Sequence, residues 1–101
     1  MRGDHHLVVR LRAVDGRADE LRAELVELAE ASRATLGCTG FVVSRSVESE
    51  SEFWLFESFD SPEAYAAHVA APHAQRFLTV TLPGLVAERQ TLTVTPTRAA
   101  P

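Results

Sequence analysis

The chain has 101 residues, 46% of them hydrophobic, and a formal net charge of −4 at pH 7. This length fits one globular domain, and the hydrophobic content is too high for a disordered chain. The acidic balance, with no basic cluster to offset it, argues against nucleic acid as a partner. No apolar run approaches the roughly 18 residues that cross a bilayer, so no membrane partner is expected.

Missing residue types narrow the chemistry further. All ten basic residues are arginine, so no lysine can form a Schiff base, and no asparagine can hold an oxyanion. Neither GxGxxG nor GxxxxGK followed by Ser or Thr occurs, so nothing signals a bound nucleotide. The single cysteine, Cys38, excludes an intrachain disulfide and favours a reducing compartment. The N-terminus also reaches a strand too early for a signal peptide, so we expect the protein in the cytoplasm.

The first half of the chain predicts a strand, a helix and a second strand. Apolar residues alternate over residues 6–14, which indicates a strand. Residues 18–34 predict a helix that ends before Gly37. Residues 40–47 read as the second strand. The predicted helix has one apolar stripe, formed by Leu21, Leu25, Leu28 and Ser32.

The second half predicts a third strand, two short helices and a last strand. Residues 52–59 form the third strand, joined to the second by a short polar link that predicts a hairpin. Asp60 is expected to cap a helix that runs from Pro62 to about residue 70 and is broken at Pro72. The remaining predictions are a short helix over 73–82, ended by Pro83, a strand over 88–94, tails over 1–5 and 96–101, and one domain over 6–95.

This β-α-β-β-α-β order is typical of an α+β, ferredoxin-like fold with a four-stranded antiparallel sheet and helices on one face. The third predicted strand is nevertheless apolar on both faces, with Trp54 and Phe56 on one and Phe53, Leu55 and Phe59 on the other. A chain of 101 residues cannot cover both faces, so a partner subunit should cover the second. The pattern therefore predicts a homodimer.

Glu57 is the strongest candidate for a functional residue, because it is an acid on the same strand face as the apolar residues Phe53, Leu55 and Phe59. Burying an acid costs free energy unless the acid is paired. Two roles therefore remain for Glu57, a structural acid or an acid that binds a ligand. His68 borders the apolar stripe of the next predicted helix and is the candidate partner of Glu57, although a packed core histidine stays the alternative.

Metal binding is not expected from the spacing of the histidines. His68 and His73 are five residues apart with Pro72 between them, not the three or four that align ligands on one helix face. Together with Glu57 they could form a facial triad for iron, but nothing in the spacing enforces it. Cys38 has no neighbour in sequence that would lower its pKa, and we expect it to be packed rather than reactive.

A larger set of residues resembles the antibiotic biosynthesis monooxygenase family, and within it the YgiN-type quinol monooxygenases. The residues that carry the resemblance extend over about residues 6–95: Gly37, Cys38, Phe41, Val43, Phe53, Glu57, Phe59, Ala64, His68, His73 and Phe77. It implies a homodimer, a dimeric α/β barrel with sheets packed face to face and a pocket between sheet and helices in each subunit. The Asn and Trp of the family's anthrone-oxidising members have no counterpart pair here.

The resemblance implies a monooxygenase that uses no cofactor and oxidises a polycyclic phenol, quinol or anthrone-type metabolite with O2. His68 would remove a proton, and the Glu57 carboxylate would orient the His68 ring and favour its charged form. Arg76 or backbone N–H groups would stabilise the oxyanion. Further contacts with this small aromatic metabolite are expected from Phe41, Phe53, Trp54, His73 and Phe77. Two alternatives remain: an isomerase or cyclase that uses the same acid–base pair without O2, and a dimer that only binds a small ligand.

Overall fold

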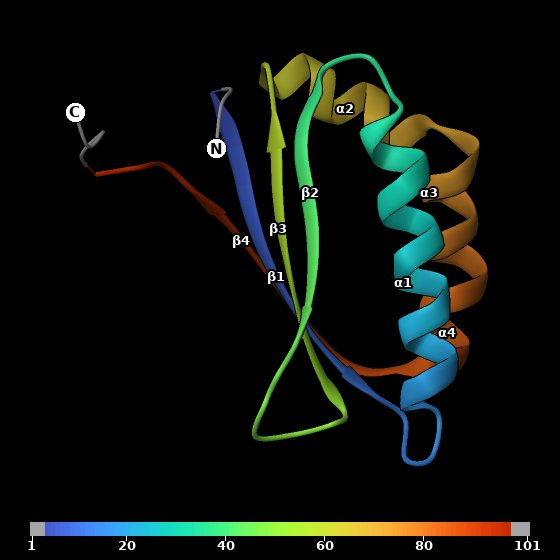
Figure 1. The fold of residues 1–101 in the computed structure, drawn as a ribbon. Coiled ribbons are helices and arrows are strands. Elements are labelled where there is room, and N and C mark those ends of the chain that lie inside the picture. Colours follow the sequence, from blue (N-terminus) through green and yellow to red (C-terminus); the bar gives the residue numbers. More distant parts are fainter. Residues whose placement is uncertain (1–3, 98–101) are drawn as a thin grey trace.

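The computed structural model describes residues 4–97 and contains one four-stranded sheet with its helices on one face (Figure 1). The strands are β1 (His5–Ala13), β2 (Cys38–Arg45), β3 (Glu52–Phe59) and β4 (Val86–Val94), in the order β2-β3-β1-β4. All neighbouring strands are antiparallel. This confirms the predicted ferredoxin-like α+β fold. The predicted tails, 1–5 and 96–101, lie largely outside the described residues.

Helix α1 (Ala18–Arg33) packs on the sheet through the predicted stripe of Leu21, Leu25, Leu28 and Ser32, all buried. These residues meet the inward-facing side chains of the strands in a single core. No helix in the described part of the chain is long and apolar enough to cross a membrane.

Helix α2 (Pro62–Ala70) is held against the start of β2 by a close backbone contact. Ser61, not the predicted Asp60, caps α2, and its Oγ accepts a hydrogen bond from the Ala64 N–H at 3.0 Å. The Asp60 N–H instead donates to the Gly37 carbonyl at 2.8 Å. Gly37 has φ of +90°, and a Cβ there would lie 2.7 Å from the Ala64 Cβ, so only glycine allows this approach. The contact fixes the position of α2 over the sheet.

The segment after α2 forms one continuous helical run made of α3 (Pro72–Arg76), the π-helical turn η1 (Phe77–Thr81) and α4 (Leu82–Leu85). We predicted a helix over residues 73–82 that is ended by Pro83, and the observed run continues through Pro83 to Leu85. The Leu82 N–H donates to the Phe77 carbonyl five residues back, which widens the turn just before the proline. A wider turn accommodates a proline ring that would otherwise clash with the preceding turn.

One face of the sheet has no helix over it (Figure 1), and an apolar row crosses all four strands on this face. Backbone register aligns Val42 with Phe56, Phe56 with Val8, and Val8 with Leu92. Phe56 is 37% exposed, Leu92 46% and Val42 51%. This row is the exposed apolar surface that the two-faced pattern of β3 predicted.

Candidate active site

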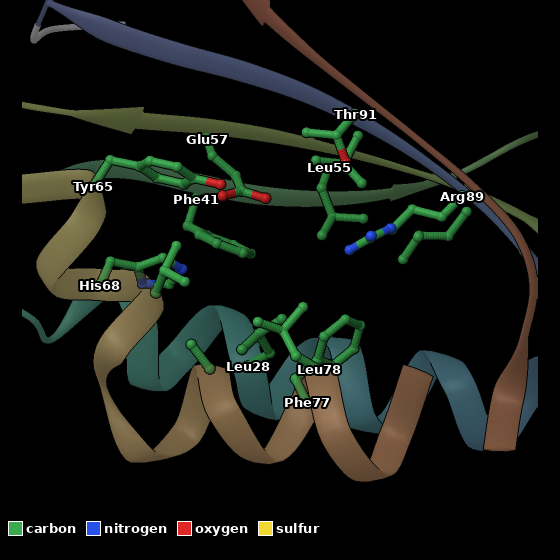
Figure 2. Close-up of a pocket in the computed structure, with 14 residues that line it drawn as sticks. Leu28, Phe41, Leu55, Glu57, Tyr65, His68, Phe77, Leu78, Arg89 and Thr91 are labelled. Atoms are coloured by element: carbon green, nitrogen blue, oxygen red, sulfur yellow. The ribbon is translucent and has the colours of Figure 1, made fainter. Parts of the chain in front are cut away.

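A cavity of about 200 Å³ lies between the helix-covered face of the sheet and the helices (Figure 2). Most of its lining is apolar, and a few polar groups converge on it, as in sites for small molecules. The polar lining residues are Glu57, Tyr65, His68, Arg89 and Thr91, and the apolar ones include Val9, Leu28, Phe41, Leu55 and Phe77.

Glu57 reaches the cavity from the middle of the sheet. It lies between Leu7 of β1 and Phe41 of β2, its register partners on either side, and is only 7% exposed. Among the described residues, no side chain or backbone group forms a hydrogen bond or ion pair with its carboxylate. Burial raises its pKa to about 7, because the apolar surroundings disfavour the charged form. A carboxyl group with this pKa exchanges its proton near neutral pH.

His68 reaches the same cavity from α2 and is also 7% exposed. Its ring lies 4.9 Å from that of Phe59 and 5.9 Å from that of Phe41, measured between centroids. Its Nδ1 is buried without a hydrogen-bond partner in the described chain. Burial, and then the positive charge that His73 can carry, lower the pKa of His68 to about 4. The imidazole is therefore neutral at neutral pH and keeps a free nitrogen.

Glu57 and His68 thus both line the cavity, as we expected, but Glu57 does not stabilise the charged form of His68. The sequence suggested that a nearby carboxylate would orient His68 and favour its charged form. Instead the pKa of His68 falls, and no hydrogen bond joins the two side chains among residues 4–97. Desolvation outweighs any attraction between them, because both groups are enclosed by apolar neighbours.

Tyr65 is a polar lining residue that the sequence analysis did not single out as part of the site. It precedes His68 by one helical turn on α2, and the two ring centroids lie 6.2 Å apart. Burial and the nearby charge of Glu57 raise the pKa of its hydroxyl, which therefore stays protonated and can donate a hydrogen bond. The sequence did contain a signal for Tyr65, because it lies three residues before His68 and residues with this spacing share a helix face.

The predicted ligand contacts separate into residues at the cavity and residues away from it. Phe41 and Phe77 line the cavity. Phe53 is fully buried below the guanidinium of Arg45, and Trp54 points to the opposite face of the sheet, where its indole N–H donates to Glu52 at 2.8 Å. These two aromatic side chains are part of the packing and of the outer face, respectively.

His73 and Arg76 line a neighbouring groove between α1 and the α3–η1 segment. Arg76 forms an ion pair there with Glu24, with 2.8 Å between the guanidinium and the carboxylate. Its side chain therefore does not point into the cavity. The His73 ring lies 5.6 Å from that of His68, and its Nε2 is buried without a partner among the described residues. His73 therefore lies next to the His68 ring but lines the neighbouring groove and not the cavity.

Within residues 4–97, no group of three or more His, Cys, Asp or Glu side chains is arranged to hold a metal ion. Cys38 is partly buried, and burial raises the pKa of its thiol. The thiol therefore stays protonated at neutral pH and is a poor nucleophile or metal ligand. That the protein works without a cofactor stays a prediction.

Solved structures of similar fold cover nearly the whole chain. PA3566 from Pseudomonas aeruginosa is 24% identical, with a TM-score of 0.88, over 99% of this chain and 98% of that one. Rv0793 from Mycobacterium tuberculosis is 22% identical, with a TM-score of 0.87, over 98% of this chain and 100% of that one. A Deinococcus radiodurans protein, provisionally described as an antibiotic biosynthesis monooxygenase, is 26% identical, with a TM-score of 0.86, over 96% of each chain.

No curated protein matches the sequence. The family model for antibiotic biosynthesis monooxygenases matches residues 4–80, a segment that includes β1 to β3, α1, α2 and every polar lining residue except Arg89 and Thr91. The chain therefore belongs to the antibiotic biosynthesis monooxygenase family.

Proposed function

We propose that the protein is a cofactor-independent monooxygenase that oxidises a phenol, quinol or anthrone-type compound with O2. The observation that carries this proposal is a buried carboxyl group, Glu57, whose pKa of about 7 suits it to proton transfer inside an apolar cavity. Structural neighbours provisionally described as monooxygenases of the same family support the reaction class.

The volume of the cavity favours the smaller members of this substrate class. At about 200 Å³ it lies below the roughly 300–1,000 Å³ of sites that enclose drug-sized ligands. A quinol with one or two rings fits this volume better than three fused rings. Phe41 and Phe77 would form walls against the ring.

Proton removal starts the proposed reaction. Glu57 as carboxylate takes the proton of a quinol O–H, and the electron-rich anion passes one electron to O2. The two radicals combine to form a C–O bond at the ring carbon. Loss of the ring C–H proton and cleavage of the O–O bond then release one water and leave a hydroxyquinone. One oxygen atom of O2 thus enters the product and the other leaves as water.

His68 and Tyr65 would assist as neutral hydrogen-bonding groups. With its pKa at about 4, His68 is a weak base, but its neutral imidazole lines the cavity and can form a hydrogen bond with the substrate hydroxyl or the forming peroxide. The Tyr65 hydroxyl can donate to the phenolate oxygen. We therefore assign the base to Glu57 and the positioning of the substrate to His68, the reverse of the roles that the sequence suggested.

We further propose that the protein works as a homodimer in which the sheets pack face to face. The support is the exposed apolar row of Val8, Val42, Phe56 and Leu92 on the face without helices. A contiguous apolar surface of this kind marks an interaction site. A cytoplasmic location stays a prediction from the single cysteine.

Oxygen-isotope labelling tests the proposed reaction. Protein treated with EDTA is incubated with a one- or two-ring quinol under ¹⁸O2, and the product is analysed by mass spectrometry. We expect one labelled oxygen per product molecule, above the level of spontaneous oxidation in matched buffer. Turnover that continues under nitrogen would identify an isomerase or cyclase instead, and binding without turnover of any quinol would indicate a binding protein.

A further inference from the structure

Arg89 places a positive charge at the end of the cavity that is remote from Glu57. Register on β4 sets Arg89 beside Leu11 and Thr91 beside Val9, both inward-facing residues of β1. The Arg89 side chain therefore lies on the helix-covered side of the sheet, and Figure 2 shows its guanidinium directed into the cavity.

No acid in the described part of the chain neutralises Arg89. Its neighbour in sequence, Glu88, lies on the opposite face, as strand alternation requires, and pairs there with Arg10 and Arg12. Five other arginines have carboxylate partners within 4 Å: Arg10, Arg12, Arg17, Arg45 and Arg76. Arg89 has neither an ion pair nor a hydrogen bond among residues 4–97. A guanidinium with no internal partner that faces an apolar cavity is available for a ligand.

The two ends of the cavity differ in charge and would orient a ligand. On β1, the register partner of Glu57 is Leu7 and that of Arg89 is Leu11, four residues apart, which separates the two rows by about 13 Å along the strand. Ionised Glu57 repels an anion, and Arg89 attracts one. The positive charge of Arg89 also counteracts part of the rise in the pKa of Tyr65, so its field extends across the cavity.

We propose that Arg89 binds a carboxylate substituent of the ligand, so that the natural substrate is an aromatic acid rather than a neutral quinol. The planar guanidinium matches a carboxylate with two parallel hydrogen bonds. The ring would lie against Val9, Leu55 and Phe77, and its far end would meet Glu57 and His68. This inference rests on the proposed use of the cavity as the substrate site, but not on any reaction with oxygen.

Binding of two probes of equal shape and different charge tests the inference. Isothermal titration calorimetry compares 2-naphthoate with 2-naphthamide on the wild type and on Arg89→Gln, Arg89→Lys and Arg22→Gln. Arg22 is the matched control, because it too is exposed and has no ion pair among the described residues, but it lies on α1 away from the cavity. Melting temperatures verify that each variant is folded.

We expect the wild type and Arg22→Gln to bind the carboxylate about tenfold more tightly than the amide. Arg89→Gln should lose this preference with its affinity for the amide unchanged, and Arg89→Lys should keep part of it. Added salt should weaken only the binding of the carboxylate.

Three results would overturn the inference, and they differ in what they say about the site. Equal binding of both probes that Arg89→Gln leaves unchanged removes the role of Arg89 but leaves the cavity as a ligand site. Equal weakening of both probes by Arg89→Gln indicates a packing role. No binding of either probe to the wild type counts against the cavity as the substrate site, and so against the proposed function as well.

Discussion

Glu57 on β3 and His68 on α2 face one cavity, and burial reverses the usual order of their pKa values. The pKa of the carboxyl rises to about 7, and that of the imidazole falls to about 4. In water, a carboxylic acid gives up its proton at lower pH than an imidazolium does. Between pH 4 and 7 both side chains are therefore largely neutral, and of the two Glu57 alone changes charge near neutral pH.

The rate of oxidation should depend on pH through Glu57. If its carboxylate is the base, kcat/KM rises with pH, reaches half its maximum at about pH 7 and then levels off. Initial rates of oxygen uptake from pH 5.5 to 8.5, corrected for spontaneous oxidation, measure this profile. A rate that is already at its plateau at pH 5.5 would instead indicate His68, with its pKa of about 4, as the base.

The stability of the fold should fall between pH 6.5 and 8 because of Glu57. Its pKa is raised from 4.5 to about 7, so its stabilising contribution is complete below pH 4.5 and is lost as the pH rises through 7. The lowered pKa of His68 acts in the opposite sense, but only between pH 4 and 6.5. Above pH 6.5 Glu57 therefore dominates, and the expected loss is about 1 kcal/mol.

Thermal melts at pH 6.5 and pH 8 check this expectation. The wild type should lose about 4–8 °C in melting temperature over this interval. Glu57→Gln cannot ionise, so it should lose much less and should melt above the wild type at pH 8. The same decrease in both proteins would show that Glu57 is not the group responsible.

The contact between Gly37 and α2 should be sensitive to a single methyl group. Gly37→Ala introduces a Cβ 2.7 Å from that of Ala64, in addition to the strain of a positive φ. Gly16→Ala is the matched control, because Gly16 also has a positive φ, +78°, but nothing lies within 4 Å of the new atom. We expect Gly37→Ala to lose about 1–3 kcal/mol more than the control in urea unfolding. Equal losses would mean that the backbone conformation alone requires glycine.

The apolar row on the open face should mediate dimer formation. Phe56→Glu places a charge in the centre of this row on both subunits and should give a monomer, whereas the wild type should have about twice the 11.0 kDa of one chain. Val47→Glu is the control, since Val47 is also apolar but lies fully exposed in the hairpin link. Analytical ultracentrifugation gives the masses. A monomeric wild type at micromolar concentration would contradict the proposed dimer.

The fold, and the positions of Glu57 and His68 at one cavity, could be predicted from the sequence because both depend on periodicity. Alternation along β3 puts Glu57 on the same face as Phe53 and Leu55, and helical spacing puts His68 beside the buried face of α2. The same alternation could not show which face of β3 the helices cover. Trp54 was therefore expected at the ligand, although it lies on the opposite face.

The residues that the sequence misplaced or missed depend on tertiary neighbours. We expected Arg76 to contact the ligand, but it forms an ion pair in another groove with Glu24, which is distant in sequence. Arg89 and Thr91 were missed because the inward positions of β4 are polar, so alternation of polarity does not mark that strand's inner face. The raised pKa of Glu57 likewise depends on how deeply the folded protein buries its carboxyl group, and residue spacing in the sequence does not reveal that burial.

The effect of Glu57→Gln on cofactor-free oxygen uptake tests most directly whether Glu57 is the base. Rates are measured at pH 8 on EDTA-treated protein with 1,4-dihydroxy-2-naphthoate, a two-ring quinol that also carries a carboxylate. We expect Glu57→Gln to lower the enzymatic rate about 10²- to 10⁴-fold while it binds 2-naphthoate at least as tightly as the wild type. His68→Gln should lower the rate by a smaller factor. Wild-type turnover that Glu57→Gln leaves unchanged would show that Glu57 is not the base.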